Sequence, residues 1–221
     1  MFRFQVWSAA MTSRRLSSMH EPALPDSALP ARWTTSRYLK LVDDGVLGPG
    51  DRVELVEGVL VPMAPQNVPH SAGVTRVDHI LQRAVGRRGI VRVQLPFIAG
   101  PRSVPEPDAA VDAAPLERWD AEQPREAYLI VEVAESSLKF DRLTKRGVYA
   151  AAGIPEYWIV NVVNDCVEVR REPIPDERRY ANVTIARRGQ RLQLAALPGV
   201  RVRVSDLLPS RASVRRHVAD Q

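Results

Sequence analysis

Short runs in which apolar residues alternate or follow one another make up most of this chain, and turn residues separate them. The segment DRVELVEGVLVPM holds two alternating runs on either side of Glu57-Gly58, which predicts a β-hairpin. Further runs predict strands at residues 90–99, 108–113 and 127–135. The polar stretch between the last two strands, PLERWDAEQPRE, predicts a loop.

The second half of the chain continues the strand pattern. PEYWIVNV and CVEVRRE predict a pair of strands with a turn at Asn164-Asp165. YANVTIA and RLQLAAL predict another hairpin around Arg188-Gly189, and VRVRVSDLL follows it.

Three segments instead show helical spacing. SRYLKLVDDG, capped by Thr34 or Thr35, predicts a short helix that ends at Gly45. A second helix is expected from about Ser71 to Gly86, with an apolar face formed by Val74, Val77, Leu81 and Val85. LTKRGVYAAAG predicts a third helix. This order predicts an α/β or α+β domain in which helices flank a mixed sheet, with a helix and a hairpin at its N-terminal end.

The length of 221 residues suffices for one domain with tails, and a hydrophobic content of 45% supports a packed core. We expect the domain at residues 31–209, between a disordered extension at residues 1–30 and a flexible tail at residues 210–221. The chain has no apolar stretch of about 18 residues and no long apolar region of a signal peptide. We therefore expect no membrane span and a cytoplasmic location.

Charge and cysteine content narrow the possible functions. The net charge of +5 favours an anionic partner such as nucleic acid, although the basic residues are locally dense only at residues 87–92 and in the C-terminal third. The single cysteine, Cys166, excludes an internal disulfide and a cysteine-based zinc cluster. Lysine occurs only at Lys40, Lys139 and Lys145, and its compact charge differs chemically from the arginine fork used elsewhere.

Two carboxylates lie in runs that otherwise predict buried strands. Asp108 follows Pro107 at the start of one strand, and Glu132 interrupts the apolar run AYLIVEVAE. A buried carboxylate is costly unless it is paired or holds a metal. The simpler interpretation is a salt bridge or a loop anchor at each position. Two carboxylates from neighbouring strands can instead share a hard divalent cation such as Mg²⁺ or Mn²⁺, which activates water and neutralises phosphate charge.

Lys145 is the candidate for stabilising the developing charge on a phosphate. Helical spacing places Asp141, Lys145 and Tyr149 on one face, although an exposed Asp-Lys pair would give the same pattern. Lys139 lies nearer to Glu132 in sequence but just before the expected helix, so it ranks second, as a possible phosphate contact.

Two further residues belong to the candidate site. Glu54 lies in the first strand of the hairpin and could complete a metal shell, whereas Glu57 at the turn is expected to be solvated. His70 lies near the start of the second helix, where it could cap the helix or contact a phosphate. A structural role is the more common one for a single histidine at such a position.

The segments EPD, VEVAESS and DRLTKRGVYAAAGIPEYWIV, taken in this order, resemble the Uma2 family of bacterial endonucleases. RVELVEGVLVPM, the helix with His70 and LPGVRVRVSDLL resemble it too, so the likeness covers residues 31–209. It implies a restriction-endonuclease-like fold of the PD-(D/E)XK type, in which Asp108 and Glu132 are the metal carboxylates. The usual E-x-K lysine position holds Ala134, and Lys145 on the following helix matches the lysine of this family.

Three functions remain open at this point. The first is an endonuclease dependent on Mg²⁺ or Mn²⁺ that cleaves DNA, with Asp108, Glu132 and Glu54 at the metal and Lys145 at the transition state. The second is a non-catalytic nucleic-acid-binding module on the same fold, which would bind DNA with a strong salt dependence. The third is a structural or dimerising protein whose charges form internal ion pairs. Exposed sheet edges could also support a homodimer.

Overall fold

The computed structural model describes residues 32–48, 50–113, 116–120, 122–212 and 214. The expected extension at residues 1–30 lies outside these residues, as does most of the expected tail at residues 210–221. None of the helices in the described residues combines the length and apolar character that a membrane crossing requires.

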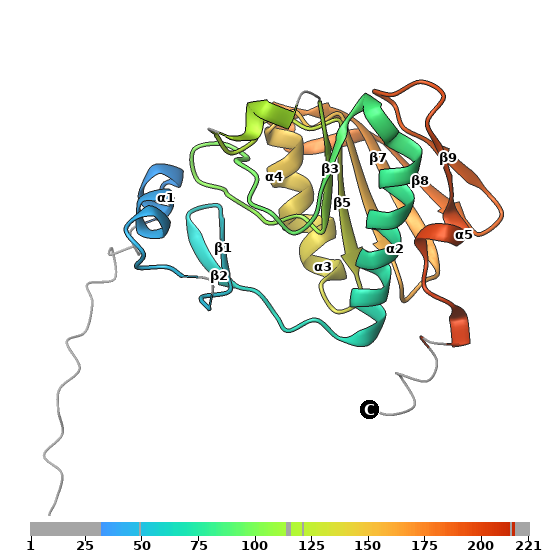
Figure 1. Cartoon of the computed structure of the whole chain (residues 1–221), viewed down its shortest axis with the longest axis horizontal. Coiled ribbons are helices and arrows are strands. Elements are labelled where there is room, and N and C mark those ends of the chain that lie inside the picture. The colour runs from blue at the N-terminus through green and yellow to red at the C-terminus, as the bar shows by residue number, and fades with distance from the viewer. Residues whose placement is uncertain (1–31, 49, 114–115, 121, 213, 215–221) are drawn as a thin grey trace, which may run out of the picture. The chain divides into compact units, whose positions relative to one another are not determined.

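A mixed sheet of six strands forms the centre of the fold (Figure 1). Its strands, in spatial order, are β3 (Ile90–Arg92), β4 (Ala109–Asp112), β5 (Leu129–Ala134), β6 (Glu156–Asn161), β7 (Cys166–Ile174) and β8 (Arg179–Arg187). The pair β5–β6 is parallel, and the other neighbouring pairs are antiparallel. Parallel neighbours need a crossover connection, which helical segments between β5 and β6 provide. The predicted α/β class, with helices flanking a mixed sheet, is confirmed.

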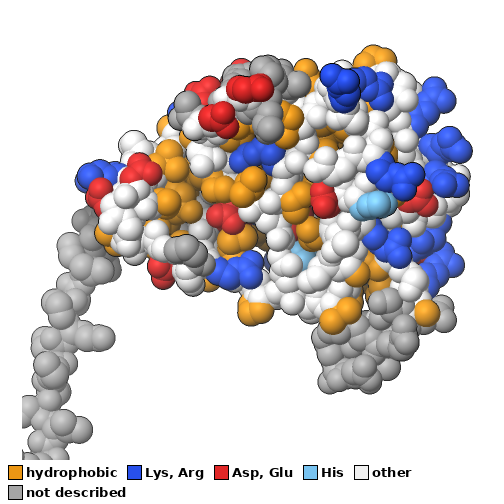
Figure 2. Space-filling model, viewed as in Figure 1, with side chains coloured by type: hydrophobic (Ala, Val, Ile, Leu, Met, Phe, Trp, Pro, Cys, Tyr) orange, Lys and Arg blue, Asp and Glu red, His pale blue; other side chains and the backbone are white. Residues whose placement is uncertain are grey.

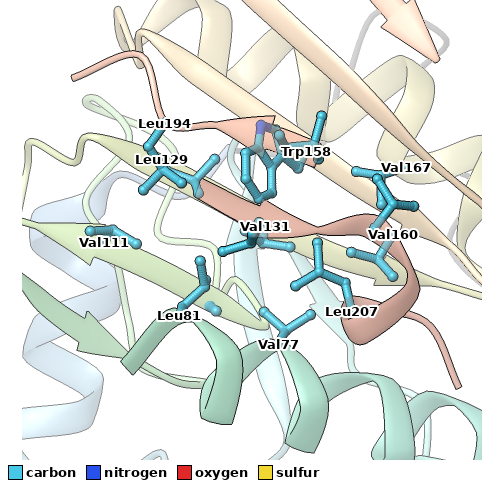
Figure 3. Packing of buried hydrophobic residues seen from close by; sticks show 14 of the residues in the cluster. Val77, Leu81, Val111, Leu129, Val131, Trp158, Val160, Val167, Leu194 and Leu207 are labelled. Atoms are coloured by element: carbon cyan, nitrogen blue, oxygen red, sulfur yellow. The ribbon is translucent and has the colours of Figure 1, made fainter. Parts of the chain in front are cut away.

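One face of the sheet is covered by α2 (Val68–Val85) and the short helix α5 (Val204–Leu207). Figure 3 shows Val77 and Leu81 of α2 pointing toward Val131 on the central strand β5. All three side chains have no exposed surface. Burial of side chains of this size stabilises a fold by about 1.5–3 kcal/mol each, so this contact fixes α2 against the sheet.

A glycine lets α2 approach β5 closely near the start of the helix. A Cβ atom at Gly73 would lie 2.6 Å from Cγ1 of Val133, well inside the usual carbon–carbon contact of about 3.5–4 Å. The helix itself begins at Val68, because the side chain of Asn67 accepts a hydrogen bond from the backbone N–H of His70 at 3.1 Å. The cap and the close approach together place His70 beside the end of β5.

The opposite face of the sheet is covered by one helical run with three segments. They are α3 (Leu138–Phe140), a π-helical turn (Asp141–Lys145) and α4 (Arg146–Ala151). Val148 and Tyr149 of this run pack on Ile130 of β5 and Ile159 of β6 in a second buried cluster. As expected from strand alternation, Ile130 and Ala134 face this cluster, whereas Val131 and Val133 face α2.

The predicted N-terminal helix and hairpin are present as α1 (Thr35–Asp43), β1 (Val53–Val56) and β2 (Val59–Pro62). The hydroxyl of Thr34 accepts from the backbone N–H of Arg37, as a capping residue should. Glu57 and Gly58 both have positive φ, which matches the twist of a two-residue hairpin turn. A third buried cluster, which includes Tyr38, Leu55 and Val104, joins these elements.

The strand predicted at residues 90–99 is wrong beyond its first three residues. β3 ends at Arg92, and Gln94 has a φ of 50°. This left-handed backbone and Pro96, which has no N–H to donate, end the ladder. The chain then follows an irregular path in which the N–H of Phe97 bonds the carbonyl of Pro105 at 2.9 Å.

The hairpin predicted around Arg188-Gly189 is also wrong in its pairing. β9 (Arg191–Gln193) pairs with β10 (Arg201–Arg203) in a separate two-stranded sheet and not with β8. Leu192 and Val202 are buried in the cluster beneath α2, so packing against that helix decides the partner of β9.

Three short 3₁₀ segments complete the described elements, at Gly86–Arg88, Leu116–Asp120 and Pro175–Glu177. The second of them lies in the stretch for which a loop was predicted. The helical run after β5 begins at Leu138, so Lys139 lies inside the run. The prediction that Lys139 lies just before the helix is therefore wrong.

Candidate functional site

A cavity of about 330 Å³ opens where β1, the start of α2, the ends of β4 and β5, and the π-helical turn meet. Its titratable lining residues are Arg52, Glu54, His70, Glu106, Asp108, Glu132, Glu135, Asp141 and Lys145. Glu54, Asp108, Glu132, Lys145 and His70 were all singled out from the sequence, although they are spread over more than ninety positions. The fold therefore gathers them into one site.

Strand register explains why the two strand carboxylates lie at the same end of the sheet. Ala109 of β4 pairs with Val131 of β5 in an antiparallel ladder. Asp108 precedes Ala109, and Glu132 follows Val131, so the antiparallel direction brings both to one end. Both are buried, with exposed fractions of 7% and 4%.

Three donors fix the carboxylate of Asp108. Its Oδ2 accepts the backbone N–H of Val133 at 2.8 Å. Its Oδ1 lies 3.2 Å from Nε2 of His70 and accepts from Nε2 of Gln94, also at 3.2 Å. Burial lowers the pKa of His70, but the hydrogen bond and charge of Asp108 more than offset this, so the pKa is raised overall. His70 is thus held as a donor beside the first carboxylate.

Glu132 receives two hydrogen bonds on a single oxygen. Its Oε1 accepts from Nζ of Lys145 at 3.0 Å and from the hydroxyl of Tyr149 at 2.7 Å. Both donors come from the helical run that crosses over after β5, so the strand and its own crossover together build this half of the site. Among the described residues, both of these side-chain donors bond to Oε1 and not to Oε2 of Glu132.

Lys145 joins the hairpin to the sheet. Its Nζ lies 3.0 Å from Oε1 of Glu132 and 3.2 Å from Oε2 of Glu54. The same oxygen of Glu54 accepts the backbone N–H of Glu106 at 3.1 Å. Lys145 is only 6% exposed, so it is not half of a solvated Asp-Lys pair. Burial lowers its pKa, but the carboxylates of Glu132, Glu54 and Asp141 together hold it well above the usual lysine value.

The site holds more negative charge than its cations balance. Burial, opposed by Lys145 and reinforced by the neighbouring carboxylates, raises the pKa of Glu132 to about 8. The same causes raise the pKa of Asp141 to about 6, although Ser137 donates a hydrogen bond to it at 2.6 Å. Burial also raises the pKa of Glu106, with Glu54 as the next cause. The cluster therefore retains protons up to near-neutral pH.

These residues fit a hard divalent cation by their chemistry. Carboxylate oxygens are the ligands that Mg²⁺ and Mn²⁺ prefer, and carboxylates outnumber basic side chains in the lining of this cavity. Within the described residues, no three His, Cys, Asp or Glu side chains are already arranged as a set of metal ligands. Asp108 and Glu132 would hold such an ion, with Glu54 and Asp141 at their side.

Some site residues were missed by the sequence reasoning. Asp141 was considered only as the partner of Lys145, and Gln94 and Glu106 were not considered. Glu106 stands two positions before Asp108 in the segment PEPD, which was a usable signal. Gln94 had no such signal, because its left-handed backbone aims it into the site.

Two other residues lie elsewhere. Lys139 is exposed and does not line the cavity, so its contact with a phosphate stays a prediction. Glu57 lies at the hairpin turn, where it is 40% exposed and forms an ion pair with Arg178. It does not line the cavity either.

Comparisons with known proteins identify the family and the fold of the chain. A family model described as "Uma2: Putative restriction endonuclease" matches residues 36–205. Among solved structures, the chain is similar to "a putative nuclease belonging to DUF820" from Anabaena variabilis, with 16% identity and a TM-score of 0.60. The match covers 79% of this chain and 96% of that one, and at this identity it shows a shared fold. No curated protein matches the chain significantly.

Proposed function

Since this chain belongs to the Uma2 family, we propose that it is a nuclease that uses a divalent metal ion to hydrolyse phosphodiester bonds in DNA. The observation that carries the proposal is the buried Lys145, which lies between Glu132 and Glu54 in a cavity lined by further carboxylates. A structural ion pair would not need so many uncompensated carboxylates in an open cavity.

The metal ion, Mg²⁺ or Mn²⁺, supplies a bound water of lowered pKa and a counter-charge for the scissile phosphate. Asp108 and Glu132 would hold the ion, and Glu54 and Asp141 would support it. The donors on Asp108 and on Oε1 of Glu132 orient these carboxylates before any ion arrives. Such partners keep ligands in one orientation and tune their basicity.

Lys145 keeps its proton at physiological pH, because its pKa is held above the ordinary value. It therefore acts as a donor and not as a base. Movement of its ammonium group from Glu132 toward a phosphate oxygen would stabilise the charge that develops during attack. His70, with its raised pKa, is a second donor at the same edge of the cavity.

The test is cleavage of supercoiled plasmid and of single-stranded DNA by purified protein in EDTA, Mg²⁺ or Mn²⁺. We expect metal-dependent cleavage that Asp108→Ala abolishes. Asp44→Ala is the matched control, since Asp44 forms an exposed ion pair with Lys40 at the C-terminal end of α1. Equal cleavage by the protein and its Asp108→Ala variant would refute the proposal. DNA binding without cleavage would favour the non-catalytic binding module.

A further inference from the structure

A row of basic side chains runs along the outer flank of α2, away from the sheet. Arg76, His79 and Arg83 follow one another at intervals of three and four residues, which places them on one side of α2, and Arg87 lies just beyond the C-terminal end of the helix, in the segment Gly86–Arg88. All four are exposed. Within the helix, Arg76 and Arg83 are seven residues apart, which is about 10 Å at 1.5 Å per residue.

The small sheet beside α2 extends this basic surface. In β9 and β10 the side chains of Leu192 and Val202 point inward, and those of Arg191, Arg201 and Arg203 are exposed. Arg191 lies directly opposite Arg203 in the ladder. Like charges at such positions destabilise a sheet. Among the described residues, only Arg203 of the two pairs with a carboxylate, Asp206, at 3.1 Å. This strained arrangement of charge suits an anionic partner.

We call these side chains the arginine surface: Arg76, Arg83, Arg87, Arg191, Arg201 and Arg203. Figure 2 shows basic side chains gathered over α2, β9 and α5 on one face of the molecule, with few acidic side chains among them. α2 and β10 also pack through the same buried cluster, which fixes the two parts of the surface relative to each other.

The composition of the arginine surface discriminates between anionic partners. Among the described residues of α2, β9 and β10, Val68 is the one exposed large hydrophobic side chain, and it lies in the first turn of α2, before the basic row begins. A lipid interface or an apolar protein partner would require such residues. The surface also has no aromatic side chain on which unpaired bases could stack, as single-strand-binding proteins have. Its chemistry matches the regularly spaced phosphates of a duplex.

We propose that the arginine surface binds the phosphate backbone of double-stranded DNA that flanks the candidate site. This inference rests on the proposed function, because the duplex is taken to be the substrate of that site. His70 lies in the first turn of α2 at the cavity, and Arg83 lies thirteen residues further along the same helix. That is about 20 Å of helix, or roughly six base pairs of duplex. The surface would hold DNA well beyond the bond that is cut and would not read its sequence.

The experiment measures binding of a fluorescent 30-base-pair duplex to the full chain in EDTA over a range of salt concentrations. The test variant carries Arg76→Gln, Arg83→Gln and Arg201→Gln. The matched control carries Arg37→Gln, Arg102→Gln and Arg125→Gln, three exposed arginines outside the surface. Each variant loses three positive charges, so a general effect of net charge would appear equally in both.

We expect the test variant to bind at least tenfold more weakly at low salt. The slope of log K against log salt should become shallower by about 2–3, because each phosphate contact contributes roughly 0.9. The control should retain the slope and the affinity. Unchanged thermal melting of both variants would confirm that the exposed substitutions leave the fold intact.

Three results would overturn the inference: equal losses in the two variants, no duplex binding by the unsubstituted protein, or binding to vesicles of anionic lipid in preference to DNA. The measurement in EDTA also separates this inference from the proposed nuclease. Binding that depends on these arginines in a protein that never cleaves would refute only the nuclease. Cleavage with arginine-independent binding would refute only the role of the surface.

Discussion

Two buried glutamates of one sheet have pKa values shifted in opposite directions. Glu132 on β5 and Glu168 on β7 are each 4% exposed, and each accepts a hydrogen bond from a basic side chain. Burial raises the pKa of both. For Glu132 the pKa ends at about 8, whereas for Glu168 it ends at about 2. Although the two side chains are equally hidden from solvent, Glu132 lies deeper among protein atoms, so burial raises its pKa more, and the neighbouring charges add to the difference.

The neighbours differ in the balance of charge. Glu168 accepts hydrogen bonds from Arg142 at 3.0 Å, Arg170 at 2.8 Å and Asn161 at 2.9 Å. These donors outweigh burial and favour the ionised form. Glu132 shares one lysine with Glu54 and lies near further carboxylates that oppose its ionisation. The charge of Glu168 is thus compensated by its donors and stabilises the fold. Glu132 lies in a cavity with an excess of carboxylates, where its carboxyl group is available to a ligand.

The largest expected effect is on catalysis. Glu132→Gln should lower the rate of metal-dependent cleavage by about 1000-fold, because a metal ligand supplies several kcal/mol of transition-state stabilisation. Glu168→Gln should leave the rate per folded molecule unchanged within about threefold, since Glu168 does not line the cavity. Single-turnover cleavage at saturating enzyme measures both rates. Equal losses in the two variants would remove the distinction between the two glutamates.

For the free energy of unfolding, we expect the larger loss in Glu168→Gln and the smaller one in Glu132→Gln. Glu168→Gln should lower the free energy of unfolding by about 3–5 kcal/mol, because it leaves Arg142 and Arg170 without their buried partner. Glu132→Gln should change it by less than about 1 kcal/mol at neutral pH, since the folded protein already favours the uncharged form of that side chain. Urea unfolding in EDTA measures both. A larger loss for Glu132→Gln would contradict the charge balance described above.

The pH dependence of stability sharpens the comparison further. Folding raises the pKa of Glu132 from 4.5 to about 8, so the metal-free folded protein retains a proton that the unfolded chain releases. The free energy of unfolding should therefore fall by about 3.5 kcal/mol as pH rises from 5 to 8, and Glu132→Gln should remove most of this fall. Folding lowers the pKa of Glu168, so its contribution is complete above pH 4.5 and is lost toward pH 2. Denaturation at each pH in EDTA measures these slopes, and a flat profile would contradict the first.

The smallest effect concerns a single hydroxyl group. Tyr149→Phe removes a donor from Oε1 of Glu132 and should lower cleavage by about tenfold, as losses of outer-shell partners do. Tyr180→Phe is the control, because the buried hydroxyl of Tyr180 has no hydrogen-bond partner among the described residues. Tyr180→Phe should leave the rate of cleavage unchanged. Steady-state assays distinguish the two, and equal activities would place Tyr149 outside the machinery of the site.

Local pattern was enough to predict most elements and the two strand carboxylates. Alternation along β5 identifies Glu132 as a charge in an apolar strand, because the alternation depends only on which face is buried. Pairing between distant segments was not predictable in this way. β9 turns toward α2 because Leu192 is buried there, and Gln94 reaches Asp108 through a left-handed backbone that no periodicity indicates. The position of a residue within a strand was therefore easier to predict from the sequence than the distant segment that it contacts.

The π-helical turn Asp141–Lys145 has a consequence for how relatives are compared. The backbone N–H of Arg146 bonds the carbonyl of Asp141, five residues earlier, so this turn holds one residue more than an α-helical turn. An alignment that assumes an uninterrupted helix displaces either Asp141 or Lys145 by one position, which is about 100° of rotation. In a distant homologue, the equivalent lysine is best recognised by its reach to the strand glutamate and not by its distance along the chain.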